Sequence, residues 1–150
     1  MTESFEIALS QSKTMMADLN FEDYEEVLFV GKSIGTIVAA AIAAQSAVND
    51  RIRLVLYTPL EETFSFSLRD AVVFTGTGDP WVSKENSRIP ELCRERRVPC
   101  YMYPDADHSL ETGNIQTDLD NMRQIMEKTE EFMKRGLFTK DDSGKGTAVG

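Results

Sequence analysis

The chain has 150 residues, of which 41% are hydrophobic and 27% are charged. This length and balance fit one globular domain with a single core. Its 25 acidic residues outnumber its 16 basic ones, and the formal net charge of -9 argues against nucleic acid or an anionic membrane surface as a partner.

Neither a membrane segment nor a metal site is indicated. The N-terminus lacks a basic start and an apolar core, and no apolar run approaches the roughly 20 residues that span a bilayer, so we expect a cytoplasmic protein. Two cysteines, Cys93 and Cys100, are too few for a disulfide framework, and no Cys-x-x-Cys or histidine cluster suggests a metal site. We expect ordinary thiols, no metal and no cofactor.

Apolar spacing predicts alternating helices and strands along the chain. The first helix covers Phe5–Leu19. The predicted strands and further helices are, in order, Glu25–Val30 (strand), Ile34–Ala47 (helix), Arg51–Tyr57 (strand), Ala71–Thr75 (strand), Glu91–Arg97 (helix), Val98–Tyr103 (strand) and Ile115–Arg135 (helix).

Several of these segments carry further signals. The helix Ile34–Ala47 is apolar nearly all round, which predicts that it is buried. Pro90 fits the first turn of a short helix, and Gly136 is well placed to cap the last one. Residues 1–138 are therefore expected to form one domain, and the polar tail 139–150 to be mobile.

The alternation predicts an α/β fold with a mostly parallel sheet of about four strands and flanking helices. Active groups in such a fold gather at the carboxyl ends of the strands. Ser33 follows the first strand, Asp79 the third and His108 the last. Three residues that are far apart in the sequence are thus expected to meet at one rim.

Ser33 lies in Gly31-Lys32-Ser33-Ile34-Gly35, where an apolar strand meets an apolar helix. Gly-x-Ser-x-Gly in this context indicates a sharp turn that exposes the serine hydroxyl, and the hydroxyl needs a base. The only histidine in the chain is His108. Ser33 is therefore a candidate nucleophile, with His108 as its base and Asp79 orienting the imidazole.

Each residue also has a purely structural interpretation. Ser33 could cap the following helix, His108 could belong to a surface turn, and Asp79 could serve only a Gly-Asp-Pro turn. Asp105 and Asp107 could orient the histidine as well. A phosphate-binding loop is excluded because Glu26 stands where that motif needs a glycine, and no Gly-x-Gly-x-x-Gly opens a helix.

The pieces Gly31–Gly35, Gly76–Pro80 and Asp107–Ser109 together resemble the α/β-hydrolase fold family, whose nucleophile, acid and histidine follow in this order. The resemblance covers about Phe5 to Arg135 and corresponds to the C-terminal half of the family's sheet, so we expect an N-terminally truncated domain. It implies a serine hydrolase of carboxylic esters or thioesters, acting on a small-molecule acyl substrate through an acyl-serine.

The resemblance also implies an oxyanion hole, with one donor from the backbone N-H of Ile34. The second donor comes from an early loop in the family and has no counterpart in this sequence. The first strand is expected to lie at an open edge, where a second copy of the chain is one candidate cover. A catalytically impaired binding domain and a truncated fragment without independent function remain alternatives.

Three further residues are candidates for lining the substrate pocket. Lys32 lies beside the nucleophile and Trp81 follows Asp79 by two positions, while Thr58 follows the second strand. A solvated lysine, a core aromatic and a simple turn are the structural alternatives. The short segment from Thr58 to Asp70 predicts no large lid, which favours small acyl groups over long lipid chains.

Overall fold

The computed structural model describes residues 3–82 and 88–136, which form a four-stranded parallel sheet with helices on both faces. The strands are β1 (Val27–Lys32), β2 (Ile52–Tyr57), β3 (Ala71–Gly76) and β4 (Cys100–Tyr103), in the spatial order β1-β2-β3-β4. Every neighbouring pair is parallel. The predicted α/β class and strand number are confirmed.

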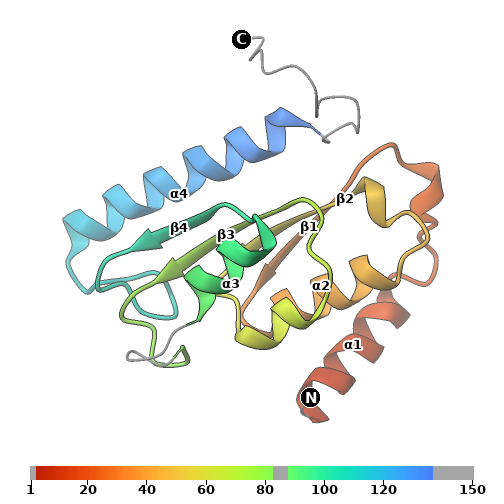
Figure 1. The fold of residues 1–150 in the computed structure, drawn as a ribbon, viewed down its shortest axis with the longest axis horizontal. Coiled ribbons are helices and arrows are strands. Elements are labelled where there is room, and N and C mark those ends of the chain that lie inside the picture. The colour runs from red at the N-terminus through yellow and green to blue at the C-terminus, as the bar shows by residue number, and fades with distance from the viewer. Residues whose placement is uncertain (1–2, 83–87, 137–150) are drawn as a thin grey trace.

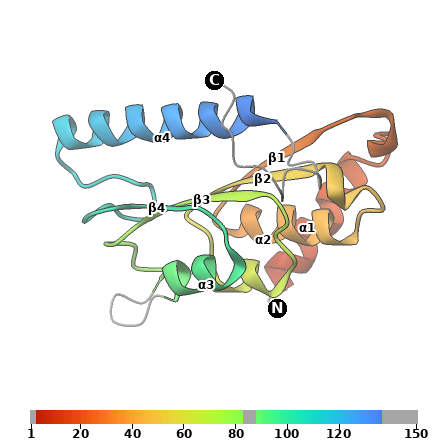
Figure 2. The ribbon, with the colours of Figure 1, turned by 45° about the horizontal axis from the view of Figure 1, so that its top comes forward.

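The elements form three layers (Figures 1 and 2). Helix α4 (Ile115–Arg135) lies alone on one face, while α1 (Glu3–Met15), α2 (Ile34–Gln45) and α3 (Ile89–Arg96) lie on the other. Three short 3-10 turns, η1 (Phe21–Asp23), η2 (Asn49–Arg51) and η3 (Glu61–Ser65), join the elements. The carboxyl ends of all four strands therefore meet at one rim.

Helix α2 is buried between the sheet and α1, which explains why it is apolar all round. Ala39, Ala40 and Ala43 face the sheet core, whereas Ile37 and Ile42 pack with Phe5 of α1. Small alanine side chains let the helix approach the strands closely. The buried helix expected from the sequence is thus confirmed.

The first strand differs from its prediction in two respects. β1 continues to Lys32 because Gly31 and Lys32 still pair with β2. It is also not covered on both faces along its whole length: Leu28 joins the core under α4, but Val30 is 60% exposed. The reason is that β1 is an edge strand, as the resemblance implied.

Other boundaries shift for local reasons. Helix α1 ends at Met15, four residues before the predicted end at Leu19. The Met15 side chain is 86% exposed, so its burial does not hold the helix together at this end. β4 begins at Cys100 because Pro99 has no N-H for the ladder.

Helix α4 has the predicted bounds, and the Asn114 side chain caps it by accepting from the Thr117 N-H. The predicted domain end at residue 138 and the tail 139–150 lie outside the described residues. Within them, no helix is long and apolar enough to cross a bilayer.

Candidate active site

Ser33 occupies the turn between β1 and α2 in a conformation that is costly for a side chain. Its φ of 54° and ψ of -126° place a non-glycine residue at positive φ. A Cβ on Gly31 would lie 2.7 Å from the Gly35 carbonyl oxygen, so the turn requires glycine at position 31. A Cβ on Gly35 would meet nothing within 4 Å. The geometry is that of a strained turn presenting a serine.

Backbone and hydroxyl contacts hold this turn in place. The Ser33 N-H donates to the Tyr57 carbonyl at 3.1 Å. The Thr36 hydroxyl donates to the Ser33 carbonyl at 2.6 Å and lies 2.7 Å from the Thr63 hydroxyl. Since the Thr36 proton is already used, Thr63 donates to Thr36. Sequence reasoning missed these two side-chain hydrogen bonds, although Thr36 is the only polar side chain among residues 34–44.

The structure brings Ser33, His108 and Asp79 together. His108 Nε2 lies 2.8 Å from Ser33 Oγ, and its Nδ1 lies 2.7 Å from Asp79 Oδ2. Since ionised Asp79 can only accept, Nδ1 carries the proton and Nε2 is left to accept from the serine hydroxyl. The three groups therefore form one directed hydrogen-bond chain.

Asp79 is almost fully buried, at 1% exposure, and its second oxygen accepts from the Trp81 N-H at 2.9 Å. Both carboxylate oxygens are thus bonded, which fixes the side chain. The His108 side chain keeps 18% exposure, so the imidazole borders solvent. The site combines a buried acid with an accessible base.

The loops that carry Asp79 and His108 pack backbone against backbone. A Cβ on Gly76 would lie 2.0 Å from the Ala106 carbonyl oxygen, and one on Gly78 would lie 2.8 Å from the Asp105 carbonyl oxygen. The Gly78 N-H donates to Ala106 at 2.9 Å, and the Asp105 N-H donates to the Thr77 hydroxyl at 2.8 Å. The two glycines therefore allow the acid and the base to approach.

The geometry also answers the structural alternatives. The Ser33 hydroxyl makes no capping bond to α2. Asp107 instead accepts from the N-H groups of Ser109 and Glu111 in its own loop. Asp79, and not Asp107, is therefore the carboxylate bonded to the imidazole, although Asp79 also closes the turn to Trp81.

The remaining predicted site residues lie in three different environments. Trp81 is 73% exposed, with its ring centroid 6.0 Å from that of His108. Ile34 begins α2, where an N-H has no partner inside the helix. Thr58 is fully buried at a φ of 42°, and no partner for its hydroxyl is present among the described residues. The expectation that Thr58 touches substrate therefore does not fit its placement.

Lys32 is exposed and lines a groove of about 460 Å³ that we call the α4 groove. Tyr57 and Ser109 also line it, and α4 supplies an apolar wall that includes Leu119 and Met122. Ser33 and His108 do not line the groove themselves, but their sequence neighbours Lys32 and Ser109 do.

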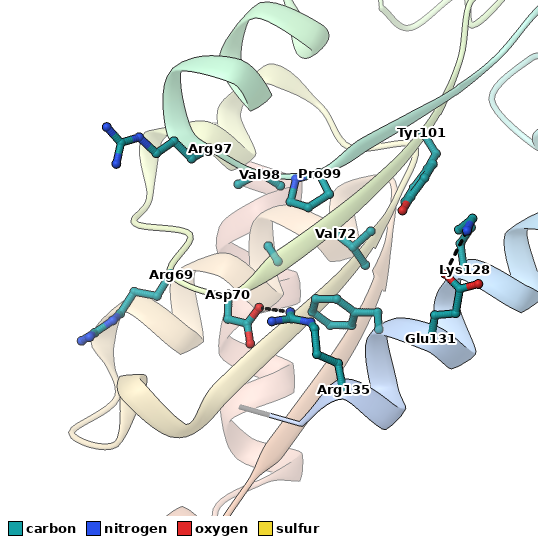
Figure 3. A pocket seen from close by; sticks show the side chains of 12 residues that line it. Arg69, Asp70, Val72, Arg97, Val98, Pro99, Tyr101, Lys128, Glu131 and Arg135 are labelled. Atoms are coloured by element: carbon teal, nitrogen blue, oxygen red, sulfur yellow. Dashed lines mark hydrogen bonds and ion pairs between the residues drawn. The ribbon is translucent and has the colours of Figure 1, made fainter. Parts of the chain in front are cut away.

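A second cavity, of about 320 Å³, lies at the opposite end of the strands (Figure 3). Its lining includes Asp70 before β3 and Pro99 before β4, together with α4 residues, and Asp70 pairs there with Arg135. Because Ser33 follows the carboxyl end of β1, this cavity has no part in the candidate active site.

Both cysteines are free and are hydrogen-bonded to each other. This bond and burial raise the pKa of the Cys93 thiol, whereas the same bond lowers the pKa of the Cys100 thiol. No group of three or more metal-ligating side chains is found among the described residues.

No protein-family model and no curated protein matches the sequence. Solved structures do resemble it. A provisionally assigned hydrolase of the α/β superfamily from Xanthomonas campestris pv. campestris is 15% identical, with a TM-score of 0.58 over 85% of this chain and 69% of that one. This likeness shows an α/β-hydrolase-like fold.

Two further solved structures give lower scores. A Bacillus cereus carboxylesterase is 18% identical (TM-score 0.49), over 88% of this chain and 62% of that one. An Agrobacterium tumefaciens str. C58 protein of unknown function is 20% identical (TM-score 0.48), over 82% of this chain and 64% of that one.

Proposed function

We propose that this α/β-hydrolase-like chain is a serine hydrolase of carboxylic esters or thioesters. The observation that carries the proposal is the directed chain from Asp79 through His108 to Ser33, with spacings of 2.7 and 2.8 Å. A serine hydroxyl is a weak nucleophile unless a base takes its proton, and this arrangement supplies the base. The positive φ of Ser33 supports the same role.

The reaction proceeds in two halves. Ser33 Oγ attacks the substrate carbonyl carbon while its proton passes to His108 Nε2, and the C-O or C-S bond breaks as His108 returns that proton to the leaving alcohol or thiol. Water then attacks the acyl carbon while His108 takes its proton, the bond from that carbon to Ser33 Oγ breaks as His108 returns the proton to Oγ, and the acid is released. Throughout, Asp79 holds the tautomer and stabilises the imidazolium.

Stabilisation of the oxyanion sets the expected rate. The backbone N-H of Ile34 is the proposed donor, since it opens α2 directly after the nucleophile. No second donor is assigned among the described residues. Loss of one donor typically costs about 10²- to 10³-fold in kcat, so we expect slow turnover of unactivated esters.

The α4 groove is the proposed acyl site. Its wall of leucine and methionine side chains suits an apolar acyl chain, and Lys32 in its lining suits a polar or anionic leaving group. Trp81 is the proposed wall on the other side of His108. Between β2 and β3 the described chain forms only η3, so nothing there resembles a large lid, and short acyl groups are favoured.

A fluorophosphonate probe tests the proposal because it forms a covalent bond only with an activated serine. We expect labelling of the wild type and none of Ser33→Ala, while the matched variant Ser10→Ala, at an exposed serine on α1, labels normally. Hydrolysis of nitrophenyl esters of increasing acyl length should favour the short esters. A folded wild-type protein that resists the probe would overturn the proposal.

The missing second donor favours one other candidate function, a binding domain that keeps the triad but turns over no ester. Such a protein would react with the fluorophosphonate yet fail to release acid from any ester. Labelling and turnover measured on the same sample therefore separate the two functions.

A further inference from the structure

The outer edge of β1 is a row of outward-facing backbone groups. The Ser33 N-H donates to Tyr57 of β2, so odd-numbered residues of β1 direct their backbone groups toward β2. Because the direction alternates along a strand, Glu26, Leu28, Val30 and Lys32 direct theirs outward. No described strand pairs with this side, and Figure 1 shows β1 at the border of the sheet.

Apolar surface lies beside this edge. Val30 is 60% exposed, and a groove of about 390 Å³ runs along the strand between α1 and α2. The groove is lined by Met15, Met16, Phe29 and Gly35 among others, and Met15 is 86% exposed. A long edge strand with apolar flanks, free of proline, is a template for pairing with another strand.

The side chains of β1 are complementary to those of a second, antiparallel β1. Since outward-facing residues must pair with each other, neighbouring registers differ by two residues. One register places Val30 opposite Leu28 and Lys32 opposite Glu26, so that apolar meets apolar and each lysine meets a glutamate. The two adjacent registers instead oppose Val30 to Glu26, or Lys32 to Leu28. Glu26 Oε1 already accepts from Arg53, so the partner's lysine would share this carboxylate. Apolar matching and this shared charge together favour the first register.

We propose that two copies of this chain pair through β1 to form a closed two-fold dimer with a continuous eight-stranded sheet. The two-fold axis passes between the two copies of Phe29, and each outward residue exchanges two hydrogen bonds with its opposite. The faces agree as well: Leu28 lies on the α4 side, where Lys32 also lines the α4 groove. Alternation places Val30 on that same side.

The other edge of the sheet is formed by a shorter strand that follows a proline. β4 has only four residues and is preceded by Pro99, which cannot donate to a ladder. Met102 on β4 is 48% exposed, so an apolar side chain at an edge is present there too. The two edges therefore provide a matched pair of positions for substitution.

Light scattering after size exclusion tests the dimer at micromolar concentration. We expect twice the chain mass of 16.8 kDa for the wild type and for Met102→Lys, and the single chain mass for Val30→Lys, which opposes a lysine to Leu28. Circular dichroism verifies that each variant is folded. A monomeric wild type, a higher oligomer, or a dimer that survives Val30→Lys would overturn the inference.

Cross-linking tests the register independently of the lysine variants. In a Cys100→Ser background, Phe29→Cys should form a disulfide-linked dimer, because directly opposed residues at a non-hydrogen-bonded site lie about 4.5 Å apart between Cα atoms. Val30→Cys is the matched control, since its two copies are offset by two positions and lie too far apart to bridge. Equal cross-linking of both variants would contradict the proposed register. If Phe29→Cys does not fold, the masses measured by light scattering decide the proposal on their own.

Discussion

Two buried polar networks lie at opposite ends of the same strands, and they are bonded in different ways. At the amino end, fully buried Arg53 donates to Asp70, to Glu26, and to the carbonyls of Phe132 and Met133, and its guanidinium lies 4.2 Å from the Phe132 ring centre. At the carboxyl end, the chain through Asp79 and His108 finishes on one hydroxyl beside solvent.

The difference teaches how to separate stability from chemistry in this fold. The Arg53 network is closed, because its donors meet carboxylates just before β1 and β3 and carbonyls of α4, and it ties α4 to the sheet. The triad is open, because the Ser33 hydroxyl ends the chain and its backbone is strained. Substitutions in the first network should change folding, and those in the second should change reactivity.

The largest expected effect is that of Asp79→Asn on reactivity. An amide cannot hold the imidazole in the required tautomer, so the labelling rate and ester kcat should fall by about 10⁴-fold. The unfolding midpoint should change little by comparison. The measurement is the second-order rate constant for fluorophosphonate labelling, with Asp105→Asn as the control at an exposed carboxylate of the neighbouring loop. Near wild-type labelling of Asp79→Asn would assign the orienting role elsewhere.

Arg53→Met should produce the opposite pattern. Removing Arg53 leaves Asp70 with Arg135 alone and deprives Glu26 and the carbonyls of Phe132 and Met133 of a donor, which should lower the free energy of unfolding by about 3–5 kcal/mol. The labelling rate of the folded protein should stay within a factor of about two to three. Urea denaturation at one fixed protein concentration measures the first quantity, and Arg51→Met, at an exposed arginine nearby, is the control. A stable Arg53→Met protein with slow labelling would break the distinction.

Thr36→Val should change both stability and reactivity, and its expected effect is the smallest of the three. Valine keeps the shape but leaves the Thr63 hydroxyl without its partner and the Ser33 carbonyl with the backbone N-H of residue 36 alone, which should cost about 1–3 kcal/mol of stability. Because the bond holds the serine turn, labelling should also slow by about tenfold, with kcat lowered more than KM is raised. Thr36→Ser restores the hydroxyl and should restore both quantities. Equal rates for the valine variant would make Thr36 purely structural.

Much of this fold could be predicted from the sequence because its signals are local. The 21-residue α4 was predicted in full from its apolar spacing and from Gly136 at its end, and α2 from a run of alanines and isoleucines. Ser33, Asp79 and His108 were predicted to meet because parallel strands end at one rim. Their catalytic role stays a prediction.

The polar contacts between elements could not be predicted in the same way. Arg53 stands in an apolar strand, and its partners come from positions 26, 70, 132 and 133, so no periodicity joins them. The burial of Thr58 depends on how the chain leaves β2, which a Thr-Pro pair does not specify. The link from Thr36 to Thr63 similarly spans 27 positions and depends on packing.

The close packing of the Gly76–Gly78 turn on the Asp105–Ala106 loop has a consequence for motion. Because main chain presses on main chain there, the segments bearing Asp79 and His108 should fluctuate together, while Ser33 is anchored separately by β1 and α2. Thermal fluctuations should then lengthen the distance between Ser33 Oγ and His108 Nε2 before they lengthen the distance between His108 Nδ1 and Asp79 Oδ2. Inactivation on warming should accordingly begin as a loss of nucleophile alignment, at temperatures where the sheet is still intact.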